Sequence, residues 1–278
     1  MIEGKRVISV CPAGRRRYME VQLPYLLNQR GLIDEHHFWA NTKDVEDLAW
    51  MQRQCDACPD FFKMVMCPAE PDGNATVTLF YALPEYRKED TIVIKVDDDI
   101  VFIAPNAIWN LLTFRLEHPE YFLVFANTVN NGWCDFLRQR TGLVADAPML
   151  VDTPGGGNAW ASGLWAEAMH RSFLGNLETG DLQMHEQAFR QFITVAGERV
   201  SINFVCWLGE DMAQLNVEGD DEHFLCNQGP RDLMKANVIC GGAVVSHYAF
   251  FPQRDYLDGT DVLKSYRSLA IREPDESL

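Results

Sequence analysis

The sequence predicts an α/β protein built on a mixed, mostly parallel central sheet flanked by helices. Two observations lead to this prediction. Short apolar runs alternate with segments of helical periodicity through the first half of the chain. The most apolar run, TIVIKVDDDIVFI at residues 91–103, has the β-branched composition of a strand buried on both faces. The 278 residues, 47% of them hydrophobic, suffice for a substantial core, and we expect a single domain spanning residues 1–278.

The first half supplies the alternation. Strands are predicted at residues 7–11, 36–40, 65–66, 92–96 and 121–126. Helices are predicted between them, at residues 18–29, 44–55, 75–83 and 106–118. Gly31 is placed to end the first helix, and Asp44 is placed to cap the second. Strands that alternate with helices imply parallel pairing through right-handed crossovers.

The second half is less regular. Strands are predicted at residues 200–207 and 238–250, helices at residues 161–174, 181–196 and 256–270, and an acidic segment that turns helical at residues 217–228. Residues 145–161 contain prolines and the run Gly155-Gly156-Gly157, and we expect a mobile loop there. The domain is therefore expected to have two functional halves, residues 1–126 and 127–278.

Charge and composition argue against several classes of protein. The net charge of −16 is unlike that of a general polyanion binder, although residues 15–17 form a local run of three arginines. No apolar stretch approaches the ~20 residues of a membrane span, and no signal peptide is visible, so we expect a cytoplasmic protein without stable membrane insertion. The eight cysteines are expected to be reduced. Cys55, Cys58 and Cys67 lack the second pair that a zinc site would need.

Three carboxylates, Asp97, Asp98 and Asp99, follow the buried strand. They repel one another and are costly to desolvate unless a cation or a proton compensates. Ligands gather at the carboxyl ends of strands in α/β sheets, so a divalent metal holding a phosphorylated ligand would explain the cluster. Alternate strand residues face opposite sides, so Asp97 and Asp99 are expected to share a face unless the strand has already turned. An acidic turn closing an edge hairpin is the alternative.

This arrangement resembles the nucleotide-sugar glycosyltransferases of the GT-A fold, in which an Asp-x-Asp element ends a β/α half. The resemblance implies that Asp99 binds Mn²⁺ or Mg²⁺, and that Asp97 meets the metal or the ribose, with Asp98 also in the nucleotide-sugar site. It implies a further metal ligand at His247, which ends an apolar run near the C-terminus. A histidine satisfied within the core is the alternative for His247.

A second acidic element resembles the one that supplies the general base in inverting members of this family. Asp220 and Asp221 stand at the start of a predicted helix, with Asp221 the first choice for the base and Asp220 the second. Acidic residues favoured by the helix dipole are the alternative. Glu210 and Asp211 form a competing acidic pair.

Other residues are expected to bind the donor. Arg15 or Arg17 would contact the diphosphate through a charge-assisted fork, with solvated surface arginines as the alternative. Asn41 and Thr42 end the predicted second strand, where the fold often contacts the base or the ribose. Trp160 would stack on the sugar if the glycine-rich loop ordered over it as a lid.

The resemblance implies a metal-dependent glycosyltransferase, a hexosyl- or pentosyltransferase, that moves a sugar from a nucleoside-diphosphate sugar, with UDP the expected nucleotide. Residues 1–126 would bind the nucleotide, and residues 127–278 would bind the acceptor and carry catalysis. A glycan or another hydroxyl compound is expected as acceptor, and nucleic acid is disfavoured by the negative charge. A sugar nucleotidyltransferase and a non-catalytic sugar-binding protein are the alternatives. A nucleotidyltransferase would normally have a glycine-rich loop after the first strand, where this chain has only Gly14.

Overall fold

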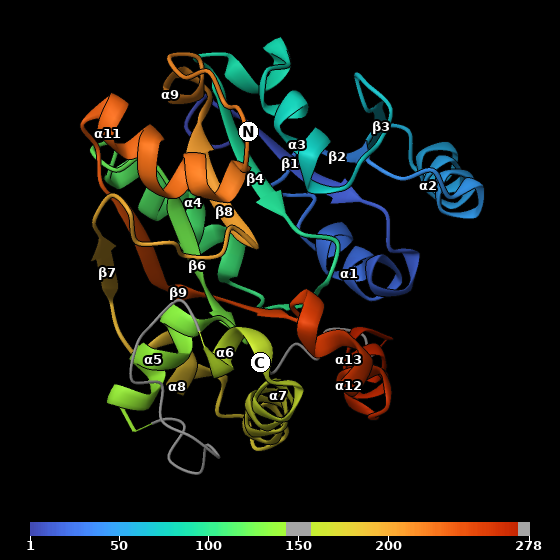
Figure 1. The fold of residues 1–278 in the computed structure, drawn as a ribbon, viewed down its shortest axis with the longest axis vertical. Coiled ribbons are helices and arrows are strands. Elements are labelled where there is room, and N and C mark those ends of the chain that lie inside the picture. Colours follow the sequence, from blue (N-terminus) through green and yellow to red (C-terminus); the bar gives the residue numbers. More distant parts are fainter. Residues whose placement is uncertain (143–156, 272–278) are drawn as a thin grey trace.

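The structure, a computed structural model, describes residues 1–142 and 157–271 (Figure 1). Over these ranges one nine-stranded sheet runs in the order β3-β2-β1-β4-β8-β6-β9-β5, with β7 paired to β9. The strands are β1 (Arg6–Ala13), β2 (Glu35–Ala40), β3 (Phe62–Met66), β4 (Thr91–Val96), β5 (Ile100–Ile103), β6 (Val124–Val129), β7 (Gln191–Thr194), β8 (Phe204–Leu208) and β9 (Asn237–His247). All of them point the same way except β5, β7 and β8, which pair antiparallel to their neighbours. The predicted mixed, mostly parallel α/β sheet is confirmed.

Helices connect the parallel strands of the first half, as predicted. They are α1 (Arg16–Asn28), α2 (Val45–Ala57), α3 (Asn74–Tyr81), the 3₁₀ turn η1 (Pro84–Arg87) and α4 (Ala107–Glu117). Asp44 caps α2, because its Oδ1 accepts hydrogen bonds from the backbone N–H groups of Glu46 and Asp47 at 2.8 and 3.4 Å.

Both faces of the sheet are covered. Alternate residues of the central strands point to opposite faces, so Ile92 and Ile94 of β4 enter one hydrophobic core while Val93 enters the other. Helices α1, α4 and α7 pack in the first core, and α3 with the segment around Phe224 packs in the second. A strand buried on both faces can carry polar side chains cheaply only where it ends, and the acidic triplet stands at that position.

The second half completes the sheet with short helices. They are α5 (Gly132–Arg140), α6 (Asn158–Ala161), α7 (Gly163–Glu178), α8 (Leu182–Glu186), α9 (Gly209–Met212), α10 (Asp221–His223), the π-helical turn η2 (Phe224–Gln228), α11 (Gly229–Leu233), the 3₁₀ turn η3 (Phe251–Gln253), α12 (Arg254–Asp258) and α13 (Val262–Ile271). Gly155 and Gly156, which we expected in a mobile loop, lie outside the described residues.

One predicted helix, at residues 181–196, is wrong. The segment forms only the short helix α8 and then the strand β7, which pairs antiparallel with β9. Gly241 makes this possible, because a Cβ at that position would collide with the backbone carbonyl of Phe189. The pairing of this segment with β9 therefore outweighs its helical propensity.

The eight cysteines are all free thiols. Throughout the described part of the chain, no helix has both the length and the apolar character needed to cross a bilayer.

Candidate functional site

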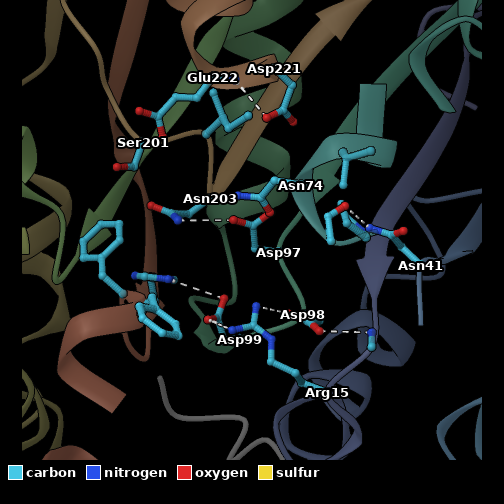
Figure 2. A pocket seen from close by; sticks show the side chains of 18 of the residues that line it. Arg15, Asn41, Asn74, Asp97, Asp98, Asp99, Ser201, Asn203, Asp221 and Glu222 are labelled. Atoms are coloured by element: carbon cyan, nitrogen blue, oxygen red, sulfur yellow. Dashed lines mark hydrogen bonds and ion pairs between the residues drawn. The ribbon is translucent and has the colours of Figure 1, made fainter. Parts of the chain in front are cut away.

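A cleft opens where the order of the parallel strands reverses. The chain passes outward from β1 to β2 and β3, and then returns to place β4 on the other side of β1. Ligands bind at such switch points, beside the carboxyl ends of the strands. The cleft has a volume of about 800 Å³ and takes its walls from both halves of the chain (Figure 2). It is lined by Pro12, Ala13, Gly14, Arg15, Asn41, Thr42, Gly73, Asn74, Val77, Lys95, Asp97, Asp98, Asp99, Trp160, Arg199, Ser201, Ile202, Asn203, Asp220, Asp221, Glu222, His247, Ala249, Phe250, Phe251 and Arg254.

The turn after β1 sits tightly against the end of β2. A Cβ on Gly14 would lie 3.3 Å from the Cβ of Thr42, so a larger residue would push the two strand ends apart. The backbone N–H of Gly14 donates to Asp98 Oδ2 at 3.1 Å. The turn thereby delivers Arg15 to the acidic triplet at the end of the adjacent strand.

Arg15 joins two members of the triplet. Its guanidinium pairs with Asp98 and, at 2.7 Å, with Oδ2 of Asp99. Both carboxylates are buried. Strand β4 ends at Val96, so the side-chain alternation does not continue through the triplet, and Asp98 and Asp99 turn to the same guanidinium. Burial raises the pKa of Asp99, but Arg15, His247 and Arg254 outweigh it and hold that pKa below its usual value.

Asp97 has different partners. Its carboxylate pairs with Lys95 Nζ and accepts a hydrogen bond from Asn203 Nδ2 at 3.2 Å. Figure 2 shows Asp97 between the group formed by Asp98, Asp99 and Arg15 and the opposite wall. The expectation that Asp97 and Asp99 act from one face is therefore not met in this structure.

His247 reaches Asp99 through strand pairing. Strand β5 pairs antiparallel with the end of β9, with Ile100 opposite His247, and the backbone N–H of Tyr248 donates to Asp99 O at 2.8 Å. His247 Nε2 lies 3.4 Å from Asp99 Oδ1. Its Nδ1 faces the carbonyl oxygen of Asn130 at 3.5 Å, and in the neutral tautomer that donates from Nδ1 the Nε2 atom is available as a metal ligand.

Asp99 and His247 fit two ligands of one divalent cation. Among the described residues, no hydrogen bond reaches the buried Oδ1 of Asp99. Adjacent ligands at about 2.1 Å from an octahedral ion lie about 3 Å apart, close to the separation of this oxygen from His247 Nε2. Asp97 does not complete the set, because its two oxygens face Lys95 and Asn203. Oxygen atoms of the substrate would have to fill most of the remaining coordination positions of the ion.

Asp221 lies on the opposite wall, at the start of α10. It is buried, its Oδ2 accepts a hydrogen bond from the hydroxyl of Tyr81 at 3.1 Å, and its Oδ1 accepts one from the N–H of Glu222 at 2.9 Å. Burial raises the pKa of Asp221, and the nearby Lys95 ammonium opposes that rise. A carboxylate that is partly desolvated and faces an open cleft can accept a proton from a bound hydroxyl group.

The competing acids have other roles. Asp220 caps α10 through the N–H of His223 at 2.6 Å and pairs with Arg199 at 2.8 Å. Asp211 is buried and pairs with Lys235 at 2.7 Å, away from the cleft. Asp221 is therefore better placed for proton transfer than either of these residues.

Of the other residues predicted to bind the donor, Asn41, Thr42 and Trp160 line the cleft and Arg17 does not. Asn41 and Thr42 line the cleft, and Asn41 is fixed by hydrogen bonds with Gly73 O and with the hydroxyl of Thr76, both at 2.6 Å. Trp160 lines the same cleft. Arg17 does not, because it pairs with Asp258 at 2.9 Å outside the cleft.

Sequence reasoning missed several lining residues. Lys95 could have been identified from the sequence, because it is the one charged residue in the apolar run TIVIKV. Arg254 follows His247 by seven positions and lies 3.7 Å from Asp99. Asn203 and Ser201 come from the segment before β8, whose amino end meets the same edge of the sheet because β8 is antiparallel to β4. Nothing in their local sequence marks them.

A second acidic cluster lies at the other end of the strands. Glu35, His37 and Glu85 bring potential ligand atoms within 4.8 Å of one another. Arg6 and Lys63 already pair with Glu35, at 2.5 and 2.7 Å. These two cations compensate the cluster, which we interpret as a structural ion-pair network.

Comparison with known proteins gives similarity only at the level of overall structure. No protein-family model and no curated protein matches the sequence. The crystal structure of residues 1–349 of S. aureus TarS is similar over 97% of this chain and 67% of that one, at 10% identity and a TM-score of 0.48. The structure of CMP:2-keto-3-deoxy-manno-octonic acid synthetase complexed with CTP is similar over 95% of this chain and 98% of that one, at 11% identity and a TM-score of 0.45. Similarities of this size leave the function to be argued from the cleft.

Proposed function

We propose that the protein is a metal-dependent glycosyltransferase that moves a sugar from a nucleoside-diphosphate sugar, with UDP as the nucleotide, to an acceptor hydroxyl. The observation that carries this proposal is the meeting of three features in one cleft. These are the Arg15-bridged carboxylates at the end of β4, His247 beside Asp99, and the buried Asp221 on the opposite wall. The end of β4 would serve the donor, and the wall that carries Asp221 would serve the acceptor.

The donor would lie along the ends of β1, β2 and β4. Asn41 and Thr42 would contact the base or the ribose. Arg15 and Arg254 are the cations best placed to bind diphosphate oxygens. Asp99 and His247 would hold Mn²⁺ or Mg²⁺, which would supply positive charge to neutralise the departing diphosphate. Residues 1–126 would thus serve the nucleotide together with His247 and Arg254, and the rest of residues 127–278 would serve the acceptor.

Transfer would proceed with inversion. The acceptor oxygen forms a bond to the anomeric carbon while the bond from that carbon to the phosphate oxygen breaks. The bonding electron pair leaves with the nucleoside diphosphate, and the hydroxyl proton passes to Asp221. Lys95, held between Asp97 and the region of Asp221, favours the ionised form of this base.

Hydrolysis of candidate donors, with water standing in for the acceptor, tests this proposal without knowledge of the acceptor. We expect Mn²⁺-dependent release of UDP from at least one of a panel of UDP-sugars. Asp221→Asn should lower that rate by about 10²- to 10⁴-fold while donor affinity stays unchanged. Asp211→Asn, which changes a buried acid away from the cleft, is the matched control. Release of pyrophosphate from CTP and a free sugar, with no hydrolysis of any sugar nucleotide, would support a nucleotidyltransferase instead.

A further inference from the structure

Two aromatic rings stand exposed at the mouth of the cleft. Trp160 on α6 is 51% exposed, and Phe251 on η3 is 79% exposed. Both line the cleft, and both come from the second half of the chain. Aromatic faces of this size gain free energy when a ligand covers them, and exposed aromatic residues beside a cleft are typical of binding sites.

The two rings are carried on one fixed frame. Gln253 is fully buried and donates from Nε2 to the carbonyl oxygen of Ala159, the residue before Trp160, at 2.9 Å. Its Oε1 accepts hydrogen bonds from Asn130 Nδ2 at 2.9 Å and from the N–H of Phe250 at 3.0 Å. The segments bearing Trp160 and Phe251 are therefore held in position before any ligand arrives, which lowers the entropic cost of binding.

Polar groups that can bond hydroxyls accompany the rings. Ser201 and Arg199 line a small recess of about 20 Å³ that Trp160 shares with the main cleft. Glu222 and Asp221 continue this wall, and Figure 2 shows them on the same side of the cleft as Ser201. Arg199 is already paired with Asp220 and Glu222, so the wall carries a net negative charge.

These features favour one class of ligand. A neutral saccharide offers apolar C–H faces that stack on aromatic rings, together with hydroxyls for carboxylate, guanidinium and serine groups. A polyanion would be repelled by Asp220, Asp221 and Glu222. A lipid chain would find carboxylates where it needs an apolar wall.

We propose that Trp160 and Phe251 form an acceptor subsite for a neutral saccharide, which stacks on these rings with one hydroxyl directed to Asp221. The inference rests on the proposed glycosyltransferase function. It assigns Trp160 to the acceptor, where the sequence led us to expect the donor sugar.

The test uses protein that has first been titrated calorimetrically with UDP, GDP and CDP in the presence of Mn²⁺. A panel of neutral disaccharides (lactose, cellobiose, maltose, chitobiose and N-acetyllactosamine) is then titrated onto the nucleotide-bound protein and followed by saturation-transfer NMR. We expect at least one disaccharide to bind, and Trp160→Ala and Phe251→Ala each to weaken it about tenfold. The melting temperature should change in neither variant, because both rings are exposed. Nucleotide affinity should not change in Trp160→Ala, which is the decisive variant, because the centroid of the Phe251 ring also lies 5.8 Å from the guanidinium carbon of Arg254.

Trp109→Ala is the matched control, since Trp109 is 50% exposed on α4 and does not line the cleft. Disaccharide binding that is unchanged in both Trp160→Ala and Phe251→Ala would overturn the inference. It would also be overturned if nucleotide bound and no disaccharide did. Failure of all three nucleotides to bind the wild-type protein would instead contradict the proposed function.

Discussion

Asp97 and Asn203 hold each other through two hydrogen bonds. The backbone N–H of Asp97 donates to Asn203 O at 2.8 Å, and Asn203 Nδ2 donates to Asp97 Oδ2 at 3.2 Å. Lys95 adds to the contact between these two segments, because its Nζ pairs with Asp97 and donates to Ile202 O at 2.9 Å. The first aspartate of the triplet thus fastens the segment before β8 to the end of β4, while Asp98 and Asp99 pair with Arg15.

We predict that Asp97→Ala mainly affects stability. The substitution leaves the buried Lys95 ammonium without its carboxylate, which should lower the free energy of unfolding by about 3 kcal/mol. Denaturant unfolding checks this. Asp56→Asn, at an exposed position on α2, should change stability by less than about 0.5 kcal/mol. Unchanged stability of Asp97→Ala together with lost Mn²⁺ binding would show that Asp97 is a metal ligand.

Substitution of Arg15 should have opposite effects on two ligands. In Arg15→Ala the carboxylates of Asp98 and Asp99 lose their counter-ion, so Mn²⁺ alone should bind more tightly. Nucleoside diphosphate should bind about tenfold or more weakly, because a charge-assisted contact is lost. Both affinities can be measured by calorimetry. Arg17→Ala, whose guanidinium lies outside the cleft, should leave both unchanged. Equal weakening of both ligands by Arg15→Ala would contradict this role.

Lys95 should set the acid limb of the pH–rate profile. Asp221 acts only when it is deprotonated, so the rate falls as pH drops through its pKa. Tyr81, Lys95 and Asp97 all influence that carboxyl group, and the Lys95 ammonium lowers its pKa. Lys95→Met should therefore move the acid limb of donor hydrolysis to higher pH, and Lys95→Arg, which keeps the charge, should move it less. An acid limb that stays in place in Lys95→Met would exclude this coupling.

Buried histidines should make the protein less stable in mild acid. Burial lowers the pKa of His36 to about 3, of His170 to about 4 and of His185 to about 3. Below pH ~6.5 the unfolded chain binds protons at these residues and the folded chain does not. The free energy of unfolding should therefore decrease as the pH is lowered from about 6.5 to 4. Asp135, whose pKa burial raises to about 6, opposes this trend, and so do carboxyl groups such as Asp221 and Glu222, whose pKa burial also raises.

The histidine effect can be measured by urea unfolding between pH 6.5 and 5. His36→Gln should reduce the slope of unfolding free energy against pH by up to about 1.4 kcal/mol per unit. A slope that is the same in His36→Gln and in the wild-type protein would mean that His36 is not held neutral by the fold.

The sequence predicted the first half well because each strand there is a local apolar run followed by a helix. The segment at residues 181–196 was predicted wrongly because β7 forms only by pairing with β9, an interaction between distant parts of the chain. The approach of His247 to Asp99 likewise depends on the pairing of β5 with β9, which no local pattern indicates.

The candidate site was predictable where chemistry is concentrated in one stretch. The triplet at residues 97–99 and the acidic pair at residues 220–221 both line the cleft. The division of labour within the triplet was not predictable, because it depends on where β4 ends and on Lys95 and Asn203. The sequence could not show that Arg15 lines the cleft and Arg17 does not. Arg15 precedes α1 and Arg17 lies in its first turn, so the start of the helix determines which of them faces the cleft.

Calorimetric titration of UDP, with and without Mn²⁺, onto wild-type protein and Asp99→Asn tests the central claim most directly. The account predicts that UDP binds the wild-type protein more tightly with Mn²⁺ than without it, and that Asp99→Asn abolishes the difference while the protein stays folded. UDP, GDP and CDP that all fail to bind at sub-millimolar concentration, or a Mn²⁺ effect that survives in Asp99→Asn, would contradict the account.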